Sequence, residues 1–131
     1  MSGSDRERIL RPTNGELVIL GVLWHRGAST VREVAAALGD EGSTVGYTTV
    51  LKQLQIMTEK GLVMRDTSRR AHVYAASHPR EETQRGMVRD MADRVFGGSA
   101  GQLILRALSG GVSAEERAEI RALLDSEEKT R

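Results

Sequence analysis

The chain has 131 residues, a net charge of +1 and no cysteine, which excludes disulfides, thiolate metal sites and cysteine nucleophiles. No stretch approaches the roughly 18 consecutive apolar residues of a membrane span, and the polar residues 1–11 lack the apolar segment of a signal peptide. These features predict a cytoplasmic protein without membrane insertion, disordered over 1–11. Only four side chains are aromatic, so aliphatic residues must fill a small core, of the kind that a second subunit often completes.

Positive charge gathers in one segment of the chain. Residues 43–76 contain five basic and two acidic side chains, a net charge of +3, whereas residues 13–42 carry a net charge of −2. A local basic patch on a nearly neutral protein favours nucleic acid as a partner. An ordinary solvated surface would show the same excess of positive charge. The charge therefore indicates nucleic acid only if the fold of this segment does so too.

Two capping boxes mark the first helices, because a threonine followed three residues later by a glutamate satisfies two backbone donors at a helix start. The boxes pair Thr13 with Glu16 and Thr30 with Glu33. They predict helices over 14–26 and 31–38, ended by Gly27 and Gly39.

A turn over 40–43 precedes a third predicted helix, over 46–60, which Ser43 or Thr44 would cap and Gly61 would end. Apolar residues at helical spacing form its buried stripe, which consists of Val50, Leu51, Leu54 and Met57. Its opposite, polar face consists of Thr48, Thr49, Lys52, Gln53 and Gln55.

The period then changes to that of strands, over 62–67 and 71–76, with the basic turn Ser68-Arg69-Arg70 between them. A helix, a short helix, a polar-faced helix and a hairpin, in that order, are typical of a winged helix-turn-helix. We therefore predict a winged-helix DNA-binding domain over 12–77, with a recognition helix over 46–60 and a wing over 62–76.

Eight residues of this region are candidates for contact with duplex DNA. Thr48, Thr49 and Lys52 share one turn of the polar face, where hydroxyls and a lysine reach base edges and thymine methyl groups. Gln53 belongs to the same predicted face. Contacts to the DNA backbone are expected from Tyr47, Arg69 and Arg70, with Arg11 as a further candidate. The competing interpretations are an exposed helix face without function, a solvated turn, and a Tyr47 side chain in the core.

The remainder, 78–131, predicts three helices, the first opened by Pro79 and the others separated by glycine pairs at 97–98 and 110–111. Their apolar residues need a partner, and the set consists of Met87, Met91, Val95, Phe96, Leu103, Leu108, Ile120, Leu123 and Leu124. We predict a helical dimerisation domain, although these helices would also be covered if they folded back on the same chain. The predicted fold class is thus mostly α (α+β), a winged helix-turn-helix followed by a three-helix dimerisation region.

No motif indicates catalysis. The three histidines lack metal-ligand spacing, and the chain has no G-x-S-x-G, phosphate loop or H-E-x-x-H. We expect neither an enzyme nor a bound cofactor or metal.

Short motifs along the chain form one combination: Leu23-Trp24, Gly27, Thr30-Val31, Val34, Tyr47-Thr48-Thr49-Val50, Leu54, Lys60-Gly61-Leu62-Val63, Arg65, Arg70-Ala71-His72, Tyr74, Phe96-Gly97-Gly98-Ser99 and Ser113-Ala114-Glu115-Glu116. This combination resembles the BlaI/MecI/CopY penicillinase-repressor family over about 13–125. The resemblance implies a homodimer that represses genes from palindromic duplex operators with TACA/TGTA-like half-sites. In that family the recognition helix matches 46–60 here.

The resemblance also implies a switch, because members respond either to copper or to proteolysis by a membrane sensor of β-lactams. A membrane sensor protease is therefore an implied partner. Copper-responsive members carry C-terminal cysteines, which this chain lacks. Cleaved members are cut at an Asn-Phe bond, and the matching pair here, Val95-Phe96, has no asparagine. Lys52 and Ile56 replace the threonine and arginine of many members, so the operator sequence is expected to differ.

Two other hypotheses remain open. A winged-helix module that binds another protein predicts negligible affinity for duplex DNA at moderate salt. A small-molecule-sensing regulator of the MarR kind predicts an apolar pocket between the domains, although few aromatic residues are available to line one.

Overall fold

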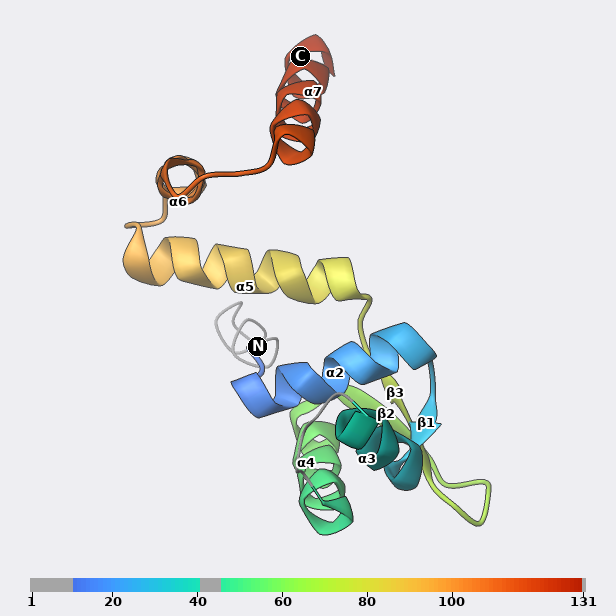
Figure 1. Cartoon of the computed structure of the whole chain (residues 1–131). Helices are drawn as coiled ribbons and strands as arrows, with labels where there is room; N and C mark the ends of the chain where they lie inside the picture. The colour runs from blue at the N-terminus through green and yellow to red at the C-terminus, as the bar shows by residue number, and fades with distance from the viewer. Residues whose placement is uncertain (1–10, 41–45, 131) are drawn as a thin grey trace. The chain divides into compact units, whose positions relative to one another are not determined.

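The computed structural model describes residues 11–40 and 46–130. Figure 1 shows a mostly helical chain with one small sheet, which confirms the predicted fold class. The chain divides into two compact units, Met1–Asp90 and Met91–Arg131. The predicted disorder over 1–11 concerns residues outside the described ranges, apart from Arg11. Within those ranges no helix is long and apolar enough to cross a membrane.

The first helix, α2 (Asn14–Arg26), begins and ends where the sequence predicts. The Thr13 hydroxyl accepts a hydrogen bond from the Glu16 backbone N–H (3.2 Å), and the Glu16 carboxylate accepts one from the Thr13 backbone N–H (2.8 Å). These two bonds confirm the capping box. Gly27 ends the helix with φ at 89°, a left-handed value that residues with a side chain rarely adopt.

The second helix, α3 (Val31–Asp40), opens with the other predicted capping box. The Glu33 N–H donates to the Thr30 hydroxyl (3.2 Å), and the Thr30 N–H donates to the Glu33 carboxylate (2.9 Å). The prediction that Gly39 ends this helix is wrong, because the helix continues to Asp40. Gly39 keeps a negative φ, and glycine permits a left-handed stop without imposing one.

The third helix, α4 (Tyr47–Lys60), is the predicted recognition helix. Ser43 and Thr44, the predicted caps, lie outside the described residues, and the N-cap is Gly46, with an extended backbone at φ −85° and ψ 169°. Neither predicted residue is therefore the N-cap. Gly61 ends the helix in the predicted way, with a left-handed φ of 79°.

Three antiparallel strands form the sheet, in the order β1-β3-β2. The strands β2 (Val63–Asp66) and β3 (Val73–Ala76) form the predicted hairpin, and each has four residues, two fewer than predicted. Their ladder ends at the pair Asp66 and Val73, so more of the chain belongs to the loop. The strand β1 (Ser29–Thr30) pairs with β3 and was not predicted, because two residues between helices show no alternation.

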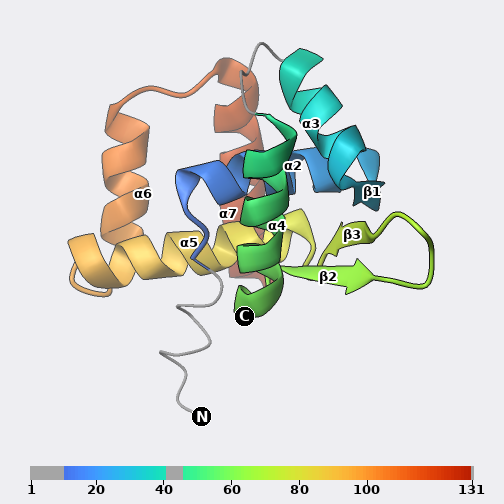
Figure 2. The same cartoon turned by 90° about the horizontal axis from the view of Figure 1, so that it is seen from below.

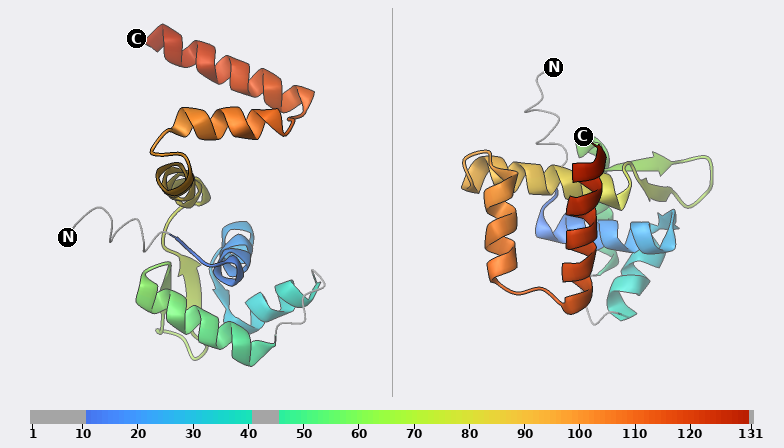
Figure 3. Two further views of the ribbon diagram at one scale, coloured as in Figure 1. Left: turned by 90° about the vertical axis from the view of Figure 1, so that its left-hand side faces the viewer. Right: turned by 90° about the horizontal axis from the view of Figure 1, so that it is seen from above.

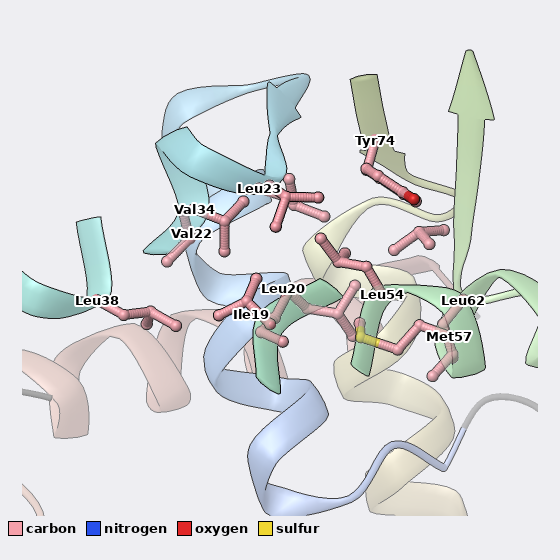
Figure 4. Packing of buried hydrophobic residues seen from close by; sticks show 13 residues of the cluster. Ile19, Leu20, Val22, Leu23, Val34, Leu38, Leu54, Met57, Leu62 and Tyr74 are labelled. Atoms are coloured by element: carbon pink, nitrogen blue, oxygen red, sulfur yellow. The ribbon is translucent and has the colours of Figure 1, made fainter. Parts of the chain in front are cut away.

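The core of the first unit lies where α2, α3 and α4 meet the sheet, and Figure 4 shows its side chains pointing toward one another from these elements. All but one of its members are aliphatic or methionine, as the composition implies. The members are Ile19, Leu20, Val22, Leu23, Val31, Val34, Leu38, Val50, Leu54, Met57, Leu62, Val63 and Tyr74. Because all three helices contribute, the position of α4 depends on α2 and α3.

A buried carboxylate ties the start of α2 to the end of α4. Glu16 is 2% exposed, and its two oxygens accept hydrogen bonds from Lys60 Nζ at 2.7 and 2.9 Å. Burial raises the pKa of Glu16, but the hydrogen bonds from Lys60 and Thr13 and the Lys60 charge outweigh burial. The pKa therefore lies below its ordinary value of 4.5. Glu16 is thus a carboxylate at neutral pH.

The next helix, α5 (Arg80–Val95), starts against α2. Trp24 Nε1–H donates to the backbone carbonyl of His78 (2.9 Å), and the Arg80 guanidinium carbon lies 5.7 Å from the centre of the indole ring. Pro79 stands directly before the helix, as predicted. The first compact unit extends to Asp90 and therefore includes most of α5.

The second unit contains the end of α5 together with α6 (Ala100–Ser109) and α7 (Ala114–Thr130), which Figure 3 shows as separate rods joined by a short connection. The predicted caps are present. The Ser99 hydroxyl accepts the backbone N–H of the third residue of α6 (3.0 Å), and Ser113 and Glu116 exchange two bonds of 3.0 Å. The three predicted C-terminal helices are therefore confirmed.

We expect Glu16→Gln to lower the free energy of unfolding by about 1–3 kcal/mol at pH 7, because it leaves the Lys60 ammonium without its carboxylate. The folded pKa of Glu16 is lowered, so its contribution is present above pH 4.5 and is lost as the pH falls below that value. The difference between wild type and variant in urea titrations should accordingly shrink from pH 6 to pH 3. A constant difference over that range would contradict this account.

Candidate nucleic-acid interface

The orientation of α4 follows from its buried stripe. Val50, Leu54 and Met57 are each 0% exposed, and their spacing places them on one side of the helix. Thr48 and Lys52 lie close to the opposite side and are exposed. Thr49, the third residue predicted to read bases, is also exposed. The structure thus brings these three side chains onto the free surface of one helix.

Gln53 lies on the flank of α4 that faces α2. It is half-buried, and a Cβ atom built on Gly15 would lie 2.8 Å from Gln53 Nε2. The outward face contains instead Gln55 and Ile56, which are both exposed. The sequence held the signal for this distinction, because 53 lies nearer than 55 to the buried stripe on a helical projection.

The N-terminal end of α4 has neither a side-chain cap nor an acidic residue in its first turn. Its N-cap, Gly46, has no side chain to accept a backbone hydrogen bond, and the first turn contains no acidic residue. The first turns of α2 and α3, in contrast, contain Glu16 and Glu33, which accept backbone N–H groups. Free backbone N–H groups and the helix dipole favour an anion at such an end. Tyr47, in this turn, is 51% exposed and so does not lie in the core.

The loop between β2 and β3 is the tip of the wing, and Figure 2 shows it projecting away from α2, α3 and α4. Asp66 Oδ1 accepts the Ser68 backbone N–H (2.9 Å), which orders the first half of the loop. Hydrogen bonds from Ser68, with the charge of Arg69, hold the pKa of the Asp66 carboxyl below its ordinary value of 3.8. Arg69 and Arg70 are both exposed at the predicted tip.

A groove of 380 Å³ lies where α3, α4 and the wing meet. We call it the wing groove. Its lining consists of Thr30, Val31, Arg32, Tyr47, Leu51, Arg70, Ala71, His72 and Tyr74. Tyr47 and Arg70, predicted separately, therefore share one recess. The basic residue that the sequence did not single out is Arg32, because only tertiary packing brings the start of α3 beside the wing.

Arg11 lies elsewhere in the same unit. Its Nη1 is 3.4 Å from Asp90 Oδ1 of α5, and both side chains are partly exposed. The structure therefore places this candidate against α5, and it is not part of the wing groove.

Comparison with known proteins identifies the family of this chain. The family model described as "Penicillinase repressor" matches residues 12–126, nearly the whole chain. This chain belongs to the penicillinase repressor family. The chain is also 33% identical over 110 residues to the transcriptional regulator BlaI of two Mycobacterium tuberculosis strains, CDC 1551/Oshkosh and ATCC 25618/H37Rv. The alignment covers 83% of this chain and 79% of each relative. The resemblance predicted from short motifs is confirmed, and the protein is a transcriptional repressor of a family of regulators, not of enzymes.

The residues predicted for dimerisation of this repressor lie on α5, α6 and α7 or directly after α5. Val95, Leu123 and Leu124 are the most exposed of them, at 66%, 64% and 63%. The others range from half-buried to exposed, and this group consists of Met87, Met91, Phe96, Leu103, Leu108 and Ile120. Within α6 no residue is buried. Exposed apolar side chains in this density are typical of a surface that another protein covers.

We expect alanine substitutions on the buried side and on the exposed side of α4 to differ in their effect on the free energy of unfolding. Leu54→Ala should cost about 2–5 kcal/mol of unfolding free energy, because it leaves a cavity in the core. Lys52→Ala should stay within about 0.5 kcal/mol of wild type, because its side chain is exposed. Thermal or urea unfolding of both variants measures this contrast. Equal costs would mean that the helix is rotated from the orientation described.

Proposed function

We propose that this protein is a homodimeric repressor that binds a palindromic duplex operator, with α4 in the major groove and the wing on the DNA backbone. The observation that carries the proposal is α4 itself. Its exposed face presents Thr48, Thr49 and Lys52 beside an N-terminal turn without acidic residues, and a basic wing tip lies in the same unit. Such a helix end attracts phosphate, and such side chains bind base edges.

In this proposal the contacts divide by chemistry. Thr48, Thr49 and Lys52 bind bases, and Tyr47, Arg69 and Arg70 bind the sugar-phosphate backbone. Residues 12–77 form the DNA-binding domain and 78–131 the dimerisation domain. The half-buried position of Gln53 against Gly15 supports a packing role for that residue, and Arg11, which pairs with Asp90, is assigned a secondary role in this proposal.

The dimer would form through the second unit. An apolar recess of 290 Å³ lies between α6 and α7, lined by Leu108, Val112, Arg117, Ile120, Arg121 and Leu124. A second copy of the chain supplies the missing apolar surface, and two-fold symmetry then presents two copies of α4 to the two half-sites. Such a repressor acts in the cytoplasm, and occupied operator excludes polymerase.

Release would follow from any event that separates the two protomers, because each half-site alone binds far more weakly. The resemblance supports a membrane sensor protease as the partner for this step. Val95 is the last residue of α5 and is 66% exposed, so the bond to Phe96 stands at an accessible helix end. Because residue 95 is valine and not asparagine, cleavage at this bond is proposed for this chain and does not follow from the family pattern.

We expect the wild-type protein to bind a duplex from its own upstream region, at two protomers per site, in preference to a scrambled duplex. Affinity should fall steeply as salt rises, because several phosphate contacts release counterions. Lys52→Ala should reduce the preference for the operator by about 1–3 kcal/mol. Equally weak binding to both duplexes would refute the proposal and favour a protein-binding winged helix.

We expect Leu124→Asp to convert the dimer into a monomer, measured by sedimentation velocity, because it places a charge on the apolar surface of α7. Operator affinity should fall by about 10²-fold as the two half-sites become independent. Glu119→Gln, at an exposed polar position of the same helix, is the matched control and should leave both properties unchanged. A dimeric Leu124→Asp protein would place the interface elsewhere.

A further inference from the structure

The wing groove contains cationic side chains from two separate elements. Arg32 comes from the first turn of α3 and Arg70 comes from the wing, and His72 of the wing also lines the groove. Tyr47 of α4 also lines the groove. The lining contains no aspartate or glutamate among the described residues. An anion is therefore the ligand that this recess fits best.

The neighbouring carboxylates are already engaged. Glu33, next to Arg32 in the chain, accepts the Thr30 N–H and lies 3.6 Å from Arg26 Nη2. Asp66, at the base of the wing, accepts the Ser68 N–H. In the part of the chain that the structure describes, neither Arg32 nor Arg70 has an ion-pair partner. Both guanidinium groups are thus available to an external ligand.

The walls of the groove also contain apolar side chains. Val31, Leu51 and Tyr74 contribute apolar surface, and Tyr74 is 1% exposed. A hydrogen bond between a guanidinium group and an anion is charge-assisted and stronger than one between neutral groups. Two guanidinium groups beside apolar surface suit a phosphodiester group with its sugar carbons.

We propose that the wing groove binds one backbone phosphodiester of operator DNA, with Arg32 and Arg70 each donating to a non-bridging oxygen. This inference rests on the proposed function and adds to it a specific contact and a residue, Arg32. Because α3, α4 and the wing all line the groove, a phosphate bound there fixes α4 at one height along the DNA strand. Arg32 is in this sense a positioning residue for the base contacts of α4.

The test compares two arginines that differ in their relation to the groove. Arg32→Gln removes a charge from the lining, whereas Arg26→Gln, the matched control, removes an exposed arginine that pairs with Glu33 outside it. Operator affinity is measured for both full-length variants across a salt series. The slope of log K against log salt should fall by about 0.9 for each protomer in Arg32→Gln, hence by about 2 for the dimer. Arg26→Gln should keep the wild-type slope.

Sequence preference supplies a second readout. Arg32→Gln should weaken binding to operator and to scrambled duplex by the same factor, because a phosphate contact carries no base information. Lys52→Ala should instead lower the preference between the two duplexes. Since Arg32 is exposed, its variant should unfold at the wild-type temperature, which separates lost binding from lost structure.

Operator duplexes with one uncharged phosphate analogue each would locate the phosphate that the wing groove binds. Single methylphosphonate substitutions along the operator should reveal one position in each half-site where wild type loses affinity and Arg32→Gln does not. Wild-type salt slope and an unchanged methylphosphonate profile in Arg32→Gln would refute the groove site while leaving the repressor proposal intact. Failure of the wild-type protein to bind any duplex would refute both.

Discussion

The winged-helix unit depends on the neutralisation of one buried charge. The carboxylate of Glu16 lies 2% exposed between helices, where an unpaired charge would be strongly destabilising. The backbone N–H of Thr13 and the ammonium group of Lys60 satisfy it. Because Lys60 is the last residue of α4, this interaction fixes the end of α4 to the start of α2, and the buried stripe then determines which side of α4 faces outward. The exposed position of Thr48 and Lys52 thus follows from the burial of the opposite side of α4.

Three helices of this protein share one capping chemistry, and α4 lacks it. The helices α2, α3 and α7 each begin with a hydroxyl and a glutamate that bond to each other's backbone groups. These bonds neutralise the positive end of each helix locally. The N-cap of α4 is Gly46, without a side-chain capping bond, its first turn contains no acidic residue, and the arginines of the wing groove lie beside it. The positive potential therefore remains at the N-terminus of α4, where a phosphate is proposed to bind. At the N-termini of α2, α3 and α7 the glutamates offset it.

The sequence predicted what depends on neighbours three or four residues apart. The capping boxes and Gly27 set the bounds of α2 correctly, and the periodicity of Val50, Leu54 and Met57 identified the buried side of α4. It failed where long-range packing decides the outcome. The two residues of β1 become a strand only because β3 is available to pair with them. The wing groove joins α3, α4 and the wing, so no local pattern in the chain could reveal Arg32 as its neighbour.

Trp24 is the only tryptophan of the chain. Its indole donates to the His78 carbonyl and lies beneath the Arg80 guanidinium, so it senses the junction between β3 and α5. An indole that loses a hydrogen bond and an adjacent cation changes its emission wavelength and intensity. DNA bases scarcely fluoresce at those wavelengths. The unlabelled repressor therefore contains an optical reporter of how α5 is attached to the DNA-binding unit, and it can be observed while the operator is present.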